Sequence, residues 1–213
     1  MKRILDFTAA LGGLILLLPL MLGLGVAVAL SSGFPVLFRQ DRVGQYGLGF
    51  TLLKFRTMDA IQSAEKGTFD AGNTRRVTTI GRFLRRTKLD ELPQLWNVVK
   101  GEMSLVGPRP EVRKWVEAYP KCWAVVHSVL PGITDPASIR FRDEEKILAR
   151  SSDPERTYRE EILPQKLSLY EEYVRTQSFW GDITIIFKTL WVVVHGQEQG
   201  AKCKAQAAKG KIV

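Results

Sequence analysis

The sequence predicts an α/β fold, mostly α with a small sheet, in which an N-terminal membrane helix precedes a compact cytosolic catalytic domain. Three observations predict it: no charged residue occurs between positions 7 and 38, two short β-prone runs flank a glycine-rich turn, and residues 89–111 hold a short amphipathic helix. Further amphipathic helices are expected at the membrane interface around the catalytic domain. The predicted divisions are 1–33 (membrane helix), 34–195 (catalytic domain) and 196–213 (basic, disordered tail).

Residues 7–30 are apolar enough to enter a bilayer and would reach about 36 Å as a straight helix. Three interpretations compete: a signal peptide cleaved after residues 27–29, a simple spanning helix, and a re-entrant helix-break-helix. Basic residues flank the segment on both sides, and Pro19 supplies a break near its middle. These features favour the re-entrant helix. Its predicted anchor residues are Lys2, Arg3, Asp6 and Pro19.

Residues 36–38 and 50–55 are predicted to be short strands around a turn at residues 44–49. Lys54 and Arg56 alternate with apolar residues, so they would share one face of the second strand. A phosphate-facing pair and a solvated edge strand both fit this pattern.

A dense cationic patch follows a polar loop predicted at residues 59–74, and no acidic residue occurs between Asp70 and Asp90. Gly81 is taken to mark the start of a helix. Arginine forks suit phosphate oxygens better than lysine does, although a basic helix on a membrane or on nucleic acid fits the charge equally well. The six cations of the patch are Arg75, Arg76, Arg82, Arg85, Arg86 and Lys88.

Two adjacent carboxylates, Asp90 and Glu91, open the helix predicted in residues 89–111. Because Pro93 is tolerated only in a first turn, the helix should begin near Asp90, at the positive end of its dipole. Residues 87–90 also fit a capping box, in which Asp90 only returns a hydrogen bond to the backbone, and spacing alone favours that cap. The arginines beside the pair favour a site, and they are expected to keep Asp90 ionised. The apolar stripe of this helix is Leu92, Leu95, Trp96 and Val99.

The segment after this helix carries aromatic residues among charges. Residues 112–129, with Trp115 and Trp123, are either interfacial helices or core packing. Residues 130–136 are predicted to be a loop fixed by two prolines. Residues 137–142 are predicted to be a short strand whose Arg142 points into the site.

The C-terminal part is charged and then strongly apolar. Residues 143–173 are predicted to form solvated helix interrupted at Pro154 and Pro164. Residues 179–194 are too short for a typical span, so an interfacial or a core helix is expected.

The composition limits the partners. A formal net charge of +9 over 213 residues points to an anionic partner: nucleic acid, an anionic lipid surface or a phosphorylated substrate. Two cysteines without a spacing motif and two histidines argue against a zinc site.

Taken together, the motifs resemble those of the bacterial sugar transferases, the monotopic phosphoglycosyl transferases, in their minimal catalytic form. The resemblance extends from Lys2 to about Val194, and its ordered motifs are specific as a set. They are Lys2-Arg3 with Asp6, the proline-broken membrane segment, residues 54–58 (KFRTM), 89–95 (LDELPQL), Asn97-Val98, 100–104 (KGEMS), 106–110 (VGPRP) and 131–134 (PGIT).

The resemblance implies a cytoplasm-facing enzyme of the bacterial inner membrane that moves a sugar-1-phosphate from a UDP-sugar to polyprenyl phosphate. Asp90 would be the nucleophile, and Glu91 would help with Mg²⁺, the expected cofactor, or with the acceptor. The resemblance also implies an anionic phospholipid membrane as partner and no nucleic acid, and it is compatible with a homodimer. The substrate- and phosphate-binding residues that it implies are Arg85, Arg109, Pro108, Pro110, Lys54, Arg56 and Arg142.

Two positions depart from the family pattern. Leu18 stands where relatives often have serine before the membrane-break proline, and Asp135-Pro136 follows Gly-Ile-Thr where many relatives carry glycine and an aromatic residue. The competing functions are a membrane-anchored basic protein that binds anionic lipid or nucleic acid, and a UDP-sugar hydrolase.

Overall fold

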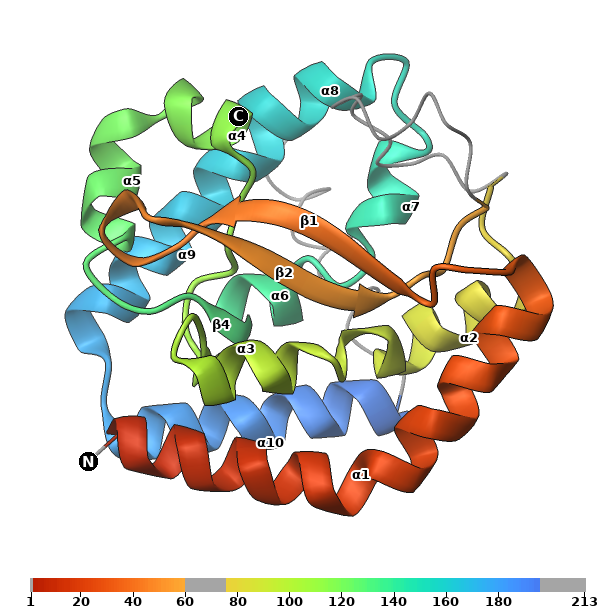
Figure 1. Ribbon diagram of the computed structural model, residues 1–213. Helices are drawn as coiled ribbons and strands as arrows, with labels where there is room; N and C mark the ends of the chain where they lie inside the picture. Colours follow the sequence, from red (N-terminus) through yellow and green to blue (C-terminus); the bar gives the residue numbers. More distant parts are fainter. Residues whose placement is uncertain (1, 60–75, 196–213) are drawn as a thin grey trace.

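The computed structural model describes residues 2–59 and 76–195 (Figure 1). Arg75, most of the loop predicted at 59–74 and the tail at 196–213 lie outside this part of the chain. The described part is mostly helical with two small two-stranded sheets and an N-terminal apolar helix, which confirms these parts of the predicted fold class. The re-entrant arrangement of that helix stays a prediction. Its elements are α1 Lys2–Ser32, β1 Leu37–Val43, β2 Gly49–Phe55, α2 Thr79–Thr87, α3 Gln94–Lys100, β3 Ser104–Val106, α4 Arg113–Ala118, α5 Pro120–Val126, β4 Gly132–Thr134, α6 Pro136–Arg140, α7 Glu144–Leu148, α8 Pro154–Thr157, α9 Leu163–Thr176 and α10 Phe179–His195.

The N-terminal helix α1 is bent near its middle, so that its two halves run along two edges of the molecule (Figure 1). Among the described helices it is the one long and apolar enough to cross a membrane. Pro19 lies inside it, yet the helix continues on both sides, so the predicted break into two separate helices is a bend instead. A proline lacks one N–H donor and clashes with the preceding turn, which is enough to bend a helix without ending it.

Polar contacts dock the N-terminal end of α1 onto the catalytic domain. The carboxylate of Asp6 is buried and accepts hydrogen bonds from Ser104 Oγ at 2.8 Å and from the Leu105 N–H at 3.1 Å. Arg3 Nη1 donates to the Val98 carbonyl of α3 at 2.7 Å. A cation suits this helix end, where carbonyls lack intrahelical partners. Two predicted anchor residues therefore fasten α1 to protein.

A third anchor residue, Lys2, joins α1 to the C-terminal helices. Its Nζ donates to the Val106 carbonyl at 2.9 Å, to Tyr173 Oη at 2.8 Å and to Asp182 Oδ2 at 2.5 Å. Asp182 lies in the first turn of α10, and α10 runs along the same edge of the molecule as the first half of α1 (Figure 1).

The predicted hairpin is confirmed. Strands β1 and β2 pair antiparallel from Leu37 opposite Phe55 to Val43 opposite Gly49, and a short 3₁₀ turn joins them. The second sheet was not predicted, because β4 falls in the segment expected as a loop; it pairs parallel with β3. Gly107 and Gly132 let these backbones meet, since a Cβ on Gly132 would overlap the backbone of Gly107.

The largest core cluster lies between α4, α5 and α9. Trp115 and Trp123 are buried in it, so core packing is correct for both and the interfacial interpretation is wrong. Tyr158, Leu163 and Tyr170 complete its centre, so the helices of residues 143–173 are not simply solvated as predicted. Aromatic side chains bring large apolar areas to such a core.

The segment after β4 is helical, so the strand predicted at residues 137–142 is wrong. Asp135 caps α6 by accepting a hydrogen bond from the Ser138 N–H at 2.8 Å, and Pro136 occupies the first turn. An aspartate cap followed by proline is a helix start. The last helix, α10, exposes large aromatic side chains, including Phe179 and Trp180, which favours the interfacial over the core interpretation.

Candidate active site

Asp90 and Glu91 lie on a 3₁₀ turn, Leu89–Glu91, between α2 and α3. The predicted helix begins later, at Gln94 with Pro93 as its N-cap, so neither carboxylate is in the first turn of α3. The capping box is also wrong, because the Thr87 hydroxyl donates back to α2 carbonyls. Both carboxylates are buried at the wall of a cavity. The tight turn places two adjacent acids at one site instead of using them as caps.

Glu91 is held by two cations. Lys54 Nζ lies 3.1 Å from Glu91 Oε1, and Arg109 donates to both carboxylate oxygens, with Nη1 3.3 Å from Oε2. Burial acts to raise the pKa of Glu91, but Arg109 and then Lys54 outweigh it and hold the pKa well below its usual value. Burial also lowers the pKa of Lys54 to about 8, despite the attraction of Glu91. Glu91 is therefore a permanent anion that positions two cations.

Asp90 differs from its neighbour. Its Oδ1 is buried and has no hydrogen-bond partner in the part of the chain that the structure describes. Burial, and then the charge of Glu91, raise the pKa of Asp90; Lys54, Lys88 and Arg109 only partly oppose this. The nearby cations lower the pKa of Asp90 as expected, but removal from water and the charge of Glu91 outweigh them, so the net shift of the pKa is upward. Asp90 therefore has a buried carboxyl oxygen that accepts no hydrogen bond from the described residues.

This carboxylate pair fits Mg²⁺ through one oxygen. Within residues 2–59 and 76–195 no group of three or more His, Cys, Asp or Glu side chains converges, so a cage built entirely from protein ligands is absent there. Mg²⁺ keeps several waters and binds through one or two carboxylates plus substrate phosphates. Asp90 Oδ1 is a hard oxygen donor that no residue of the described ranges occupies, whereas Glu91 is occupied by its cations.

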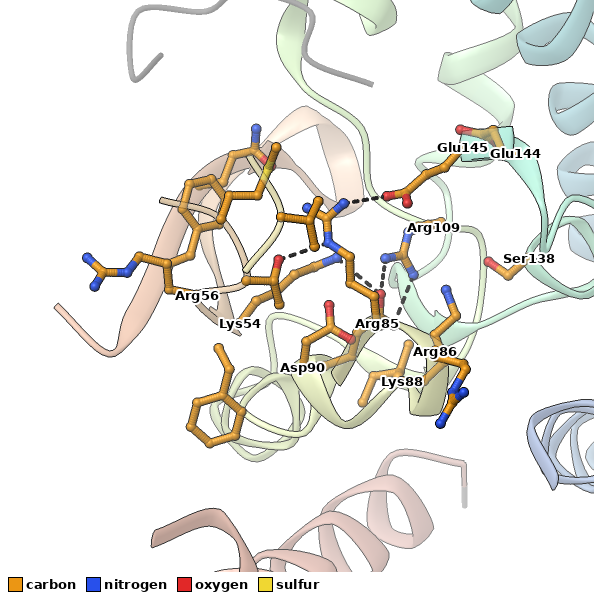
Figure 2. A pocket seen from close by; sticks show the side chains of 18 of the residues that line it. Lys54, Arg56, Arg85, Arg86, Lys88, Asp90, Arg109, Ser138, Glu144 and Glu145 are labelled. Atoms are coloured by element: carbon orange, nitrogen blue, oxygen red, sulfur yellow. Dashed lines mark hydrogen bonds and ion pairs between the residues drawn. The ribbon is translucent and has the colours of Figure 1, made fainter. Parts of the chain in front are cut away.

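Cations surround the carboxylates on the walls of a cavity of about 2500 Å³. Figure 2 shows Lys54, Asp90 and Arg109 directed toward one shared space. Arg85 lines the same cavity; its Nε donates to Thr57 Oγ1 at 2.9 Å and its Nη1 to Glu145 Oε1 at 2.8 Å. Arg82 and Arg86 of α2, and Lys88 directly after it, add exposed positive charge to the wall. The predicted clustering of cations around the acids is therefore present.

Two predicted phosphate ligands are engaged elsewhere. The Arg56 guanidinium bonds the Ser32 and Gly33 carbonyls at the end of α1, and Arg56 points away from Arg109 in Figure 2. Arg142 donates to the Val192 carbonyl of α10. Both residues line the outer cavity, but the structure does not bring either guanidinium to Asp90. They stabilise helix ends, where free carbonyls attract cations.

Pro108 and Pro110 shape the loop that carries Arg109. The Pro108 carbonyl accepts a hydrogen bond from the Gly132 N–H at 2.9 Å, and the Pro110 carbonyl accepts one from Arg42 Nη1 at 3.1 Å. The two prolines thus place Arg109 through their backbones.

A supporting network beneath this loop escaped the sequence reasoning. Glu111 is buried; it accepts hydrogen bonds from Tyr158 and from Arg42, whose Nη1 lies 3.0 Å away. The sequence signal for this network was an acidic residue directly after Pro110. Only the fold shows its partners, because they come from β1 and from the turn before α9.

Comparisons with known proteins identify the family of the chain. The family model described as bacterial sugar transferase matches residues 1–196. The chain is 38% identical over 199 residues to the UDP-glucose:undecaprenyl-phosphate glucose-1-phosphate transferase of Escherichia coli (strain K12), covering 90% of this chain and 39% of that protein. It is 35% identical to the UDP-N-acetylgalactosamine-undecaprenyl-phosphate N-acetylgalactosaminephosphotransferase of Aeromonas hydrophila, covering 92% and 44%.

A shorter relative is covered more fully. The chain is 36% identical over 194 residues to the UDP-glucose:undecaprenyl-phosphate glucose-1-phosphate transferase of Caulobacter vibrioides, covering 89% of this chain and 68% of that protein. The chain spans about two fifths of the length of the first two relatives. With a family match over nearly all of its residues, the chain belongs to the bacterial sugar transferase family.

Proposed function

We propose that this protein transfers a sugar-1-phosphate from a UDP-sugar to polyprenyl phosphate through a covalent intermediate on Asp90, with release of UMP. One observation carries the proposal: Asp90 lines a cavity walled by cations, and its buried Oδ1 has no hydrogen-bond partner among the described residues. The names of the relatives support UDP-sugars as donors and undecaprenyl phosphate as acceptor.

In the first step, a carboxylate oxygen of Asp90 attacks the phosphorus that carries the sugar. A bond forms between Asp90 and this phosphorus, and the bond from the phosphorus to UMP breaks, so that UMP leaves with the electron pair. In the second step an oxygen of polyprenyl phosphate attacks the same phosphorus. The bond to Asp90 breaks, the carboxylate is restored, and a polyprenyl-diphosphate sugar leaves. The split lets a soluble donor and a lipid acceptor use one site in turn.

The cations answer the main obstacle to this chemistry, which is repulsion between a carboxylate and an anionic diphosphate. Arg109 and Lys54 lie beside Asp90 in fixed positions, because both are bonded to Glu91. Preorganised charge of this kind stabilises the negative charge that develops on phosphate oxygens. Arg85, whose Nε donates to Thr57 Oγ1, is a further ligand for the donor phosphate. Glu91 acts as a positioning residue for the two cations.

Mg²⁺ would be held by Asp90 and by the substrate phosphates, and when bound it would supply charge neutralisation at the diphosphate. Glu91 would join it only after Lys54 or Arg109 shifts.

We further place the protein on the cytoplasmic face of the bacterial inner membrane, held by α1 as a re-entrant helix. The exposed apolar side chains of α1 and the exposed aromatic residues of α10 support a lipid-facing edge. The bend of α1 supports a helix that returns to the side from which it entered (Figure 1). A reporter fused to residue 1 that reports from the periplasm would contradict this topology.

The test is UMP release by the purified full chain with UDP-glucose, UDP-galactose and UDP-N-acetylgalactosamine, each with and without undecaprenyl phosphate and Mg²⁺. The proposal expects acceptor-dependent turnover of at least one donor. It also expects loss of UMP release in Asp90→Asn, while Asp59→Asn, at the outer cavity, remains active. Normal turnover by Asp90→Asn removes the nucleophile assignment. Multiple turnover without lipid acceptor would identify a UDP-sugar hydrolase instead.

A further inference from the structure

Helix α10 has two distinct faces. Thr189, Val192 and Val193 follow a spacing of i, i+3 and i+4, and all three line the active-site cavity. Leu190 and Trp191 are 55% and 62% exposed and are not among the residues that line the cavity. The C-terminal half of α10 is therefore a wall one helix thick between the cavity and an outer apolar surface.

This wall is fixed on the cavity side. Thr189 Oγ1 shares a hydrogen bond with Thr134 Oγ1 of β4, and Arg142 donates to the Val192 carbonyl. The predicted phosphate ligand Arg142 thus has a structural role, since it holds the end of α10 beside the cavity.

Helix α2 packs beside the same end of α10 and forms the other border (Figure 1). Phe83 lines the cavity and is also 43% exposed, so it lies at the rim where cavity and surface meet. Leu92, on the turn after the carboxylates, continues the apolar lining inward. Apolar side chains of α2, of α10 and of the turn after Asp90 therefore line the same cavity as Asp90.

Two exposed cations lie in the chain between Phe83 and Leu92. Arg86 and Lys88 line the cavity, are exposed, and make no ion pair with any residue that the structure describes. Arg109 and Lys54, in contrast, are already paired with Glu91. An exposed cation without an anionic partner, next to an apolar rim, suits a ligand with an anionic head and a hydrocarbon chain.

Another part of the cavity lining has a different character. It consists of charged residues of α4 and α7, including Lys114, Glu144 and Glu145. A soluble nucleotide-sugar approaches from water and needs no apolar entrance, so we assign the donor to this polar part.

We propose that the part of the cavity bordered by α2 and by the C-terminal half of α10 is the entry for the acceptor lipid. Its prenyl chain lies against Phe83 and Val193, and its phosphate is received by Arg86 and Lys88 on the way to Asp90. This inference rests on the proposed transferase function and assigns the acceptor to one side of the cavity.

The experiment compares Val193→Trp, on the cavity face of α10, with Leu190→Trp on its exposed face. Each full-length variant is assayed in two ways: single-turnover UMP release without acceptor, and steady-state transfer to undecaprenyl phosphate or to a phosphate with two isoprene units. We expect Val193→Trp to keep the first step and to raise the KM for undecaprenyl phosphate roughly tenfold, equivalent to 1.4 kcal/mol. The KM for the short acceptor should rise less, and Leu190→Trp should have the same acceptor KM as the wild type.

A second variant keeps the test informative if a tryptophan is not accommodated. Arg86→Gln, at an exposed position, should raise the KM for the acceptor more than that for the UDP-sugar. Equal acceptor KM values in wild type, Val193→Trp and Arg86→Gln would overturn the inference, as would loss of the first step in a Val193→Trp protein that folds like the wild type. If the wild type releases no UMP from any UDP-sugar, the proposed function fails and the inference fails with it. If the wild type transfers sugar-phosphate but the variants keep its acceptor KM, only the inference fails.

Discussion

The pair formed by Arg109 and Glu91 gives the sharpest test of the site's architecture. Arg109 donates to both oxygens of Glu91, and the side chains are 24% and 10% exposed. Removing one partner of such a pair leaves an uncompensated charge in a poorly solvated place. Each hydrogen bond to a charged group contributes about 1.5–3 kcal/mol, and partial exposure reduces the sum, so Arg109→Ala should cost about 2–4 kcal/mol of unfolding free energy.

A double-mutant cycle separates this interaction from other effects. Arg109→Ala, Glu91→Gln and the double variant are unfolded with denaturant in detergent micelles, and we expect a coupling free energy of about 1.5–3 kcal/mol. The exposed pair Arg175 and Glu171 on α9, with side chains 73% and 25% exposed, serves as control and should give only about 0.3–0.5 kcal/mol. Additivity of the Arg109 and Glu91 changes to within about 0.5 kcal/mol would refute the argument that Glu91 positions Arg109.

Three further predictions follow from single side chains. The ammonium of Lys54, with a pKa of about 8, loses its proton and its attraction to Glu91 as pH rises through that value, so UMP release should fall above pH 8. Lys54→Arg should extend activity to higher pH, because arginine keeps its charge. If the rate of Lys54→Arg falls above pH 8 as it does in the wild type, Lys54 does not have this role. Asp6→Ala removes two hydrogen bonds to a buried carboxylate and should cost about 2–4 kcal/mol in denaturant unfolding, with a smaller loss for Asp6→Asn; equal losses would contradict the assigned contacts. Burial lowers the pKa of His127 from its usual 6.5, so the unfolded chain binds a proton more readily below that pH and stability should decline as pH falls; melting temperatures of His127→Gln between pH 5 and 7.5 should lack this decline.

Local signals in the sequence predicted the centre of the site. Asp90, Glu91 and Arg109 belong to one stretch, and a short chain between them limits how far apart they can lie. The hairpin that carries Lys54 has a glycine-containing turn between two β-prone runs, which is a strong short-range signal. These features depend on neighbouring residues, so they could be predicted without coordinates.

Features set by distant partners could not be predicted. Strands β3 and β4 have three residues each, too few for a recognisable period, and they pair only because the chain returns 28 positions later. Arg56 and Arg142 donate to backbone carbonyls of α1 and α10. Every residue has a backbone carbonyl, so the sequence does not indicate which one will be the partner. Trp115 suits a core and a membrane interface equally well by composition.

The fastening of α1 by Arg3 and Asp6 has a consequence for how the protein meets different bilayers. A hydrophobic helix on a free linker can tilt or slide to match lipid thickness without disturbing the domain that it carries. Here such an adjustment would have to break bonds to α3 and β3, which follow the turn that carries Asp90. We therefore expect the height of Asp90 above the headgroups to be dictated by the polypeptide, while the surrounding lipids deform to suit it.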